Sequence, residues 1–284
     1  MQATLYALGA IALWVTLASL GVALRHVPPF LLTGVALLVG STLALPFVAR
    51  DRNQWKIPAR TLLLGVYGLF GYHFLLFIAL RLAPPVEANL VNYLWPLLMV
   101  VLSPLLLRNV QLRGMHVAAA LLGFAGAAVA ILGANASTGG LVVSGSWSWG
   151  YLPALGSALI WASYSLWTQR VPAFPTAAVG LFGLVSGVLS LLCHWALESQ
   201  VALSGQDWLL LVLMGLGPLG AAFFLWDKAL KLGDARQIGI LSYITPLAST
   251  SLLMVVSGRA FSWSIAVSAA MIITAALLGN RARG

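Results

Sequence analysis

The sequence predicts an all-α integral membrane protein with ten transmembrane helices, arranged as two inverted five-helix repeats with both termini in the cytoplasm. Three observations predict this fold class. Hydrophobic residues make up 61% of the 284 residues and charged residues only 7%, against roughly 45–50% and about 25% in soluble domains. The chain divides into apolar runs of about 20 residues, and its two halves share one pattern. The surplus apolar surface must face lipid.

The apolar runs have the length of membrane-spanning helices. Each run is long enough to cross about 30 Å of hydrocarbon. Every backbone polar group inside lipid needs a partner within the protein, so each run is expected to be a helix. Short connections containing proline separate several of them. The runs lie near residues 3–24, 30–48, 61–80, 88–107, 114–133, 150–169, 175–197, 208–227, 238–257 and 261–280.

The second observation is a duplication with a constant offset of 150 residues. Residues 65–97 align with residues 215–247 without a gap, and a weaker correspondence pairs Trp14 with Trp161. Five helices is an odd number, so the second half enters the membrane from the opposite face and the repeat is inverted, a plan typical of transporters. The expected units are a first repeat at 1–135, an extracytoplasmic linker at 136–149 and a second repeat at 150–284. Identical pairs include Gly65/Gly215, Phe74/Phe224, Tyr93/Tyr243 and Pro96/Pro246.

Basic residues predict the orientation. With both termini inside, twelve of the fifteen Lys and Arg residues lie in cytoplasmic segments, and only Arg25, Arg81 and Arg259 lie outside. This positive-inside bias accounts for the net charge of +9 without a nucleic-acid partner. The first span alone favours the reverse orientation, because Arg25 follows it and no basic residue precedes it. The four basic residues between positions 50 and 60 outweigh that signal.

The centres of the spans carry aromatic and amide groups instead of charges. A charge at the bilayer centre costs at least about 2.5–3.5 kcal/mol, so this absence argues against a carboxylate-driven proton pump. Trp14, Trp95 and Trp161 lie near mid-span, where an indole N–H needs a partner or a polar cavity. Trp226 is instead expected in the cytoplasmic aromatic belt. Packing between helices would explain any one central tryptophan, whereas the matched positions of Trp14 and Trp161 favour cavity walls.

Two prolines at matched positions predict interruptions in the fourth and ninth spans. Pro96 cannot donate a hydrogen bond to the carbonyl of Asn92, and Pro246 cannot donate one to the carbonyl of Ser242, so both carbonyls are expected to be free. Inverted symmetry would bring the two sites together near mid-depth. Pro96 and Pro246 are therefore the candidate hinges, although kinks that serve only packing are common in membrane helices.

The candidate substrate-binding residues surround these kinks: Trp14, Tyr72, His73, Asn92, Tyr93, Trp95, Trp161, Tyr164 and Tyr243. Such a site suits a flat, amphipathic solute, because each ring pair contributes about 0.5–1.5 kcal/mol and an ammonium group can lie on an indole face. His73 is the candidate for proton coupling, although the lack of a central carboxylate favours facilitated export. The single Cys193 and the scattered His, Asp and Glu residues predict neither a metal site nor a cofactor.

At this point the residues resemble a known family. The five-plus-five plan resembles the drug/metabolite transporter superfamily with its paired EamA-type repeats. Val91-Asn92-Tyr93-Leu94-Trp95-Pro96 and Ile160-Trp161-Ala162-Ser163-Tyr164 are similar to segments of the YddG aromatic amino acid exporters. The resemblance covers the whole chain. It implies export of Phe, Tyr, Trp and other neutral amino acids across a bacterial inner membrane by alternating access, with Tyr72, Tyr93, Trp95 and Trp161 around the substrate.

Other functions stay open at this point. An exporter of other amphipathic metabolites or drugs would use the same scaffold. A membrane-embedded enzyme would need a catalytic cluster, but His26, His73, His116 and His194 lie on four different segments. A receptor or scaffold would not explain matched aromatic residues inside the membrane. The expected partners are a small-molecule substrate and the lipid bilayer, and a monomer is the simplest assembly because ten helices can enclose a site alone.

Overall fold

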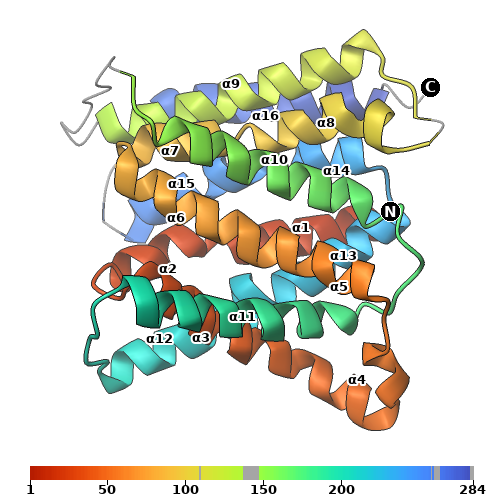
Figure 1. The fold of residues 1–284 in the computed structure, drawn as a ribbon. Helices are drawn as coiled ribbons and strands as arrows, with labels where there is room; N and C mark the ends of the chain where they lie inside the picture. Colours follow the sequence, from red (N-terminus) through yellow and green to blue (C-terminus); the bar gives the residue numbers. More distant parts are fainter. Residues whose placement is uncertain (109, 137–146, 257, 259–262, 282–284) are drawn as a thin grey trace.

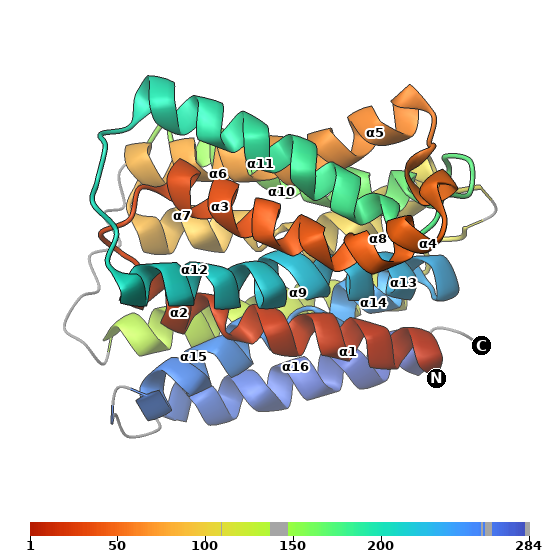
Figure 2. The same ribbon diagram turned by 90° about the horizontal axis from the view of Figure 1, so that it is seen from below.

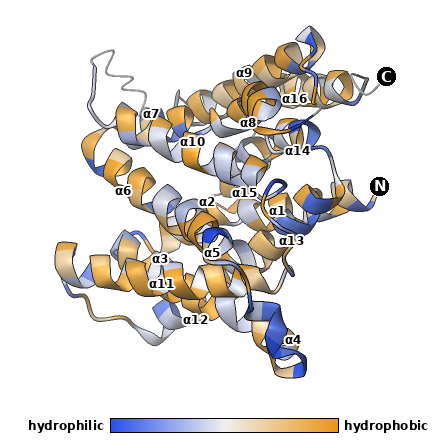
Figure 3. Cartoon of the chain, turned by 45° about the vertical axis from the view of Figure 1, so that its right-hand side comes forward, coloured by the Kyte–Doolittle hydropathy of each residue, from blue (hydrophilic) through white to orange (hydrophobic). Residues whose placement is uncertain are grey.

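The computed structural model describes residues 1–284 except 109, 137–146, 257, 259–262 and 282–284. The described residues form helices and connecting segments, and no strand occurs among them. Most long helices run alongside one another, and the N-terminus and the C-terminal end of α16 (Trp263–Arg281) lie at the end of the bundle that also carries the short helix α4 (Leu45–Arg50) (Figure 1). Figure 2 shows the same bundle from below. Most residues of the helices are hydrophobic, while hydrophilic residues gather at α4 and near the N-terminus (Figure 3).

The helices follow the predicted runs. In the first half they are α1 (Gln2–Val15), α2 (Leu17–Ala23), α3 (Pro29–Ser41), α4 (Leu45–Arg50), α5 (Ala59–Val66), α6 (Tyr72–Leu82), α7 (Pro85–Asn92), α8 (Trp95–Leu106) and α9 (Gly114–Ala136). In the second half they are α10 (Tyr151–Trp167), α11 (Ala178–Leu197), α12 (Gly205–Leu216), α13 (Ala222–Leu232), α14 (Ala235–Leu241), α15 (Ile244–Val256) and α16 (Trp263–Arg281).

Nine helical segments of the described chain are long and apolar enough to cross a membrane: Gln2–Ala23, Pro29–Arg50, Ala59–Leu82, Pro85–Leu106, Gly114–Gly133, Ala178–Leu197, Gly205–Leu232, Ala235–Val256 and Trp263–Asn280. The tenth predicted run is α10, which has 17 residues and is about 26 Å long at 1.5 Å per residue. It packs between α6 and α8. Of the basic residues that predicted the orientation, Arg259 and Arg283 lie outside the described residues.

The offset of 150 residues reappears in the irregular parts of the helices. A π-helical turn, Tyr67–Gly71, joins α5 to α6, and a second one, Gly217–Ala221, joins α12 to α13. The fourth span breaks at residues 93–94, and the ninth breaks at residues 242–243, one residue short of the same offset. Such turns loosen the regular hydrogen-bond ladder and often occur at functional sites. The described helices therefore repeat in shape as well as in sequence.

The two halves interlock through close helix contacts. α3 packs on α11, α1 packs on α13, and α9 packs on α16. Where α3 meets α11, a Cβ atom on Gly34 would lie 2.7 Å from the Leu191 side chain and 3.1 Å from the carbonyl oxygen of Gly187. Only glycine allows this approach, and small residues have the same role at other membrane helix interfaces. The packing holds α1, α6, α8, α10 and α13 around the centre.

Candidate functional site

Seven aromatic side chains meet where these five helices converge. This central aromatic cluster consists of Trp14, Tyr72, Trp95, Trp161, Tyr164, Phe223 and Trp226. Its residues come from α1, α6 and α8 of the first half and from α10 and α13 of the second half. All except Tyr72 are buried. The cluster therefore joins both repeats.

Trp161 lies at the middle of the cluster. Its ring centroid is 5.8 Å from that of Trp14, its predicted repeat mate, and 6.4 Å from that of Trp95. It also contacts Tyr72 at 5.3 Å and Tyr164 at 5.4 Å. Most of these pairs are tilted or edge-to-face, the arrangements that aromatic rings prefer. The matched tryptophans of the two repeats thus contact each other directly.

Two of the buried indoles are fixed by hydrogen bonds. Trp14 Nε1 donates to the carbonyl oxygen of Pro218 at 3.1 Å, within the π-helical turn between α12 and α13. Trp226 Nε1 donates to Ser165 Oγ at 3.2 Å. A buried indole N–H needs such a partner. These bonds set the orientation of both rings.

The side-chain amide of Asn92 borders the cluster on the side of α7. Asn92 Nδ2 donates to Tyr72 Oη at 3.1 Å, and Ser157 Oγ donates to Asn92 Oδ1 at 2.9 Å. Asn92 is the last residue of α7, directly before the break in the fourth span. The amide therefore links α6, α7 and α10, and it supplies neutral donors and acceptors next to the aromatic rings.

His73 contacts the cluster from α6. Its Nδ1 lies 2.6 Å from the carbonyl oxygen of Leu69. A carbonyl can only accept, so Nδ1 carries the proton in this contact. The imidazole lies 5.0 Å from the Tyr72 ring and 6.4 Å from the Phe223 ring. His73 and Phe223 are 150 residues apart, so they are repeat mates in contact.

The structure does not bring every predicted site residue together. Tyr243 is fully buried, but it packs with Ala127 and Ile272 against α9 and α16, away from the central aromatic cluster. Tyr93 lies in the break between α7 and α8, is half-buried, and interacts electrostatically with Tyr72 of the cluster. Trp14, Tyr72, His73, Asn92, Trp95, Trp161 and Tyr164 do meet at one place.

The two prolines lie at the helix breaks, as predicted. Pro96 is the second residue of α8, and Pro246 follows the start of α15. The prediction of a free carbonyl at Ser242 is wrong, because that oxygen accepts the N–H of Thr245 at 3.0 Å. The chain closes a tighter turn there and so satisfies the acceptor. The carbonyl of Pro96 lies against Gly239 of α14, which brings the two broken spans together.

Two members of the cluster were missed by sequence reasoning. Trp226, predicted in the cytoplasmic belt, is only 1% exposed and lies 5.1 Å from the Trp14 ring. Phe223 lies 5.7 Å from the Trp161 ring. The repeat offset offered one signal, since it pairs Phe223 with His73. The belt prediction used depth alone and ignored which side of α13 faces inward.

Beyond the cluster, repeat mates Arg81 and Lys231 form polar contacts at opposite ends of α11. At the C-terminal end of α11, Arg81 Nη2 donates to Glu198 Oε1 at 2.8 Å, and the guanidinium lies over the Phe30 ring. We call this group, with His194 and the N–H groups of Phe30 and Leu31, the Arg81 latch.

The second group lies before the N-terminal end of α11. Lys231 Nζ contacts Asp227 Oδ2 at 2.6 Å and donates to the carbonyl oxygen of Phe174 at 2.8 Å. The ammonium also lies 3.9 Å from the centroid of the Phe174 ring, and Thr176 donates to Asp227 at 2.7 Å. We call these four residues the Lys231 latch. In both latches a cation at the end of a helix lies over a phenylalanine.

The chain is similar over nearly its whole length to known transport proteins. The sequence pattern of the EamA-like transporter family matches residues 1–132 and 148–281. The aromatic amino acid exporter YddG of Ancylobacter novellus is 43% identical over 286 residues, covering 98% of this chain and 97% of the relative. The exporter YddG of Salmonella typhimurium is 28% identical, covering 98% and 96%. A solved crystal structure matches with a TM-score of 0.88 and 39% identity, covering 98% of this chain and 96% of the other.

Proposed function

The chain belongs to the EamA-like transporter family, a membrane transporter family and not an enzyme family, and from that premise we propose that it exports aromatic amino acids. The protein is a multi-pass protein of the bacterial inner membrane. Its relative from Ancylobacter novellus is named for aromatic amino acid export. Other neutral amino acids form the wider substrate range of this proposal.

The central aromatic cluster is the observation that carries the proposal. The aromatic side chain of a substrate can pack against the rings of the cluster in place of a contact between two of them. Each ring pair contributes about 0.5–1.5 kcal/mol. Its ammonium group can lie on an indole face such as that of Trp161. Its carboxylate can take neutral donors from Asn92 or Tyr72. Contacts this weak permit release, which an exporter needs as much as capture.

The proposed topology has α10 as the tenth span and both termini in the cytoplasm. α10 lies beside α6 and α8, both of which belong to long apolar segments. The N-terminus and the C-terminal end of α16 lie at the end of the bundle with α4, where the basic residues between positions 50 and 60 begin (Figure 1). The proposed repeats are 1–135 and 150–284, and most of the linker, residues 137–146, lies outside the described residues. The proposed assembly is a monomer.

The proposed mechanism is alternating access around the cluster. The breaks at Pro96 and Pro246 and the two π-helical turns give the third, fourth, eighth and ninth spans matched points at which to bend. The Arg81 latch and the Lys231 latch lie at opposite ends of α11. Opening one latch at a time would expose the cluster to one side at a time. No coupling ion is proposed, and transport is facilitative.

Counterflow in proteoliposomes tests the function. Purified protein is reconstituted with unlabelled phenylalanine inside, and uptake of labelled phenylalanine, tryptophan, other neutral amino acids and amphipathic drugs is measured with and without a pH gradient. We expect aromatic uptake that ignores the gradient. Flux no greater than in empty liposomes for every amino acid would overturn the proposal, and flux of another solute alone would reassign the substrate. If uptake depends on the pH gradient and His73→Gln abolishes that dependence, the mechanism is proton-coupled transport and not facilitated export.

A matched pair of variants tests the role of the cluster. Trp161→Ala removes the middle ring, and we expect uptake to fall at least about tenfold, because several ring contacts of about 1 kcal/mol are lost. Trp195→Ala is the control, since Trp195 is 79% exposed on α11 and contacts none of the cluster. Equal activity of the two variants would remove the cluster from the transport pathway.

A further inference from the structure

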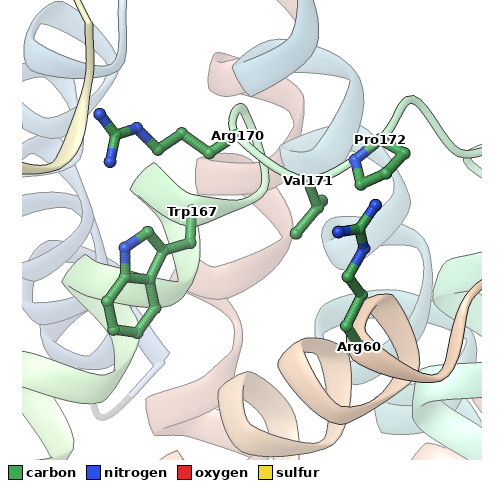
Figure 4. A pocket seen from close by; sticks show the side chains of 5 residues that line it. All are labelled: Arg60, Trp167, Arg170, Val171 and Pro172. Carbon is green, nitrogen blue, oxygen red and sulfur yellow. The ribbon is translucent and has the colours of Figure 1, made fainter.

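We propose that a cavity between α5 and α10 binds the head group of an anionic phospholipid. The cavity has a volume of about 350 Å³ and is lined by Arg60, Trp167, Arg170, Val171 and Pro172. Figure 4 shows Arg60 rising from the start of α5 beside Pro172, with the Trp167 indole on the other side of Val171. This inference rests on the membrane location and the proposed orientation of the chain, and not on its substrate.

The cavity carries positive charge without a counterion. In the part of the chain that the structure describes, the guanidinium groups of Arg60 and Arg170 take part in no ion pair or hydrogen bond. By contrast, Arg81 and Arg236 each contact a carboxylate, at 2.8 Å and 2.6 Å. Guanidinium groups match the geometry of phosphate oxygens and bind them with charge-assisted hydrogen bonds. Figure 4 shows the two guanidinium groups on opposite sides of Val171, so each offers a separate unpaired group that a head-group phosphate at this cavity can contact.

Next to the cavity, further along the chain from Arg60, the exposed surface is apolar and aromatic. Leu63 and Tyr67 follow Arg60 at helical spacing, and they are 69% and 36% exposed. On the facing helix α10, Trp167 is 37% exposed and its ring lies 6.1 Å from that of Tyr67. We call this boundary between residues 60–67 and α10 the seam. A cationic end beside an exposed apolar and aromatic surface matches the phosphate and the acyl chains of a lipid. A free amino acid would use the cationic end and leave the seam uncovered.

Depth also supports a lipid as the occupant. Basic pockets between transmembrane helices at the cytoplasmic surface bind anionic head groups, and Trp is enriched at that interface. The seam joins the two halves, because Tyr67 Oη and Ser163 Oγ are 2.8 Å apart. The next residue after Tyr67, Gly68 of the π-helical turn, lies against the Tyr164 ring of the cluster. A lipid in the seam would therefore bridge parts of both repeats beside the proposed substrate site.

Native mass spectrometry of the full chain in detergent micelles tests the inference, with phosphatidylglycerol and phosphatidylcholine as probes. We expect phosphatidylglycerol to bind the wild-type protein more tightly than phosphatidylcholine. The double variant Arg60→Gln/Arg170→Gln should weaken phosphatidylglycerol binding about tenfold. The control Arg50→Gln/Arg52→Gln removes the same charge from exposed positions outside the cavity, and it should leave binding unchanged.

Three outcomes would overturn the inference. Equal losses in the two double variants would show that net charge alone attracts the lipid. Equal binding of the two lipids to the wild-type protein would show that the cavity does not select an anionic head group. Millimolar phenylalanine could also displace phosphatidylglycerol from the wild-type protein but not from Arg60→Gln/Arg170→Gln. That result would assign the cavity to the carboxylate of the substrate. None of these outcomes affects the counterflow result, so the proposed function stands or falls separately.

Discussion

The Arg81 latch and the Lys231 latch are built around repeat mates, yet they hold their carboxylates differently. In the Arg81 latch, Glu198 accepts from Arg81, from His194 at 2.9 Å, and from the backbone N–H groups of Phe30 and Leu31 at 3.1 and 3.2 Å. The side chain of Glu198 is only 2% exposed. This carboxylate is therefore buried but supplied with donors from three helices, α3, α6 and α11.

In the Lys231 latch the carboxylate has fewer donors. Asp227 Oδ2 contacts Lys231 Nζ and Thr176 Oγ1, while Oδ1 is buried without a hydrogen-bond partner in the described structure. The side chain of Asp227 is 1% exposed. A buried carboxylate with so few donors depends on its cation, because an uncompensated buried charge is costly.

The difference teaches that two repeat mates can make the same type of contact in surroundings that hold their carboxylates differently. Both latches keep a cation over a phenylalanine at the end of an equivalent helix. The Arg81 latch joins residues of the two halves, whereas all residues of the Lys231 latch come from the second half. The two ends of the bundle should therefore respond unequally to the same kind of substitution, and the following predictions test this.

The largest effect is expected for Lys231→Gln. This change leaves Asp227 buried with only Thr176 as a donor, and the cost should be about 3 kcal/mol. The apparent unfolding temperature of the purified protein in micelles measures it. The double variant Asp227→Asn/Lys231→Gln removes the buried charge and should recover most of the stability. A double variant as unstable as Lys231→Gln would show that Lys231 acts through something other than Asp227.

A smaller effect is expected for Arg81→Gln. Glu198 keeps two backbone donors and His194, and the Arg81 side chain is 45% exposed, so the loss should be about 1 kcal/mol. The same unfolding assay in the same micelles ranks the two variants. If Arg81→Gln is as destabilising as Lys231→Gln, the number of donors does not explain the difference between the latches.

The smallest effect is expected at the N-terminus of α14, where the halves also differ. Asp234 caps α14, whereas Pro84 precedes the equivalent helix α7. Burial alone would raise the pKa of Asp234, but hydrogen bonds and charge from Arg236 more than offset this, and the pKa lies below its ordinary value of 3.8. A depressed folded-state pKa contributes stability that is present above the ordinary pKa and is lost as pH falls through the folded pKa.

Asp234→Asn should therefore lower stability near neutral pH by less than about 1 kcal/mol. The gap between wild-type protein and variant should close as pH falls below 3.8, which unfolding temperatures at a series of pH values would measure. A gap that does not change with pH would mean that the cap, and not the charge, is responsible.

How much the sequence predicts depends on whether a feature follows from position along the chain or from position around a helix. The membrane runs and the breaks at the two prolines follow from position along the chain, and nine runs match long apolar helices. A weaker correspondence outside the 150-residue duplication predicted that Trp14 and Trp161 occupy equivalent places, and their rings are in contact. The family resemblance is also confirmed.

Position around the helix was harder to predict. Trp226 has the depth expected of a belt residue, but its side of α13 faces the cluster. Tyr243 is the repeat mate of Tyr93, yet it packs against Ala127 of α9 and Ile272 of α16. The latches were also hidden, because Arg81 and Glu198 are 117 residues apart. Such contacts depend on helix packing, which a single sequence does not specify.

The most direct test of the account is the side from which the central cluster becomes accessible. Cys193 is first replaced by Ser, and Ser165, which accepts from Trp226, is replaced by Cys as a reporter. The rate of its labelling by a membrane-impermeant thiol reagent is then measured from each side of sealed vesicles. Arg81→Gln should speed labelling only from the side of the Arg81 latch, and Lys231→Gln only from the opposite side. Faster labelling from the same side in both variants, or no change in either, would contradict alternating access controlled by the two latches.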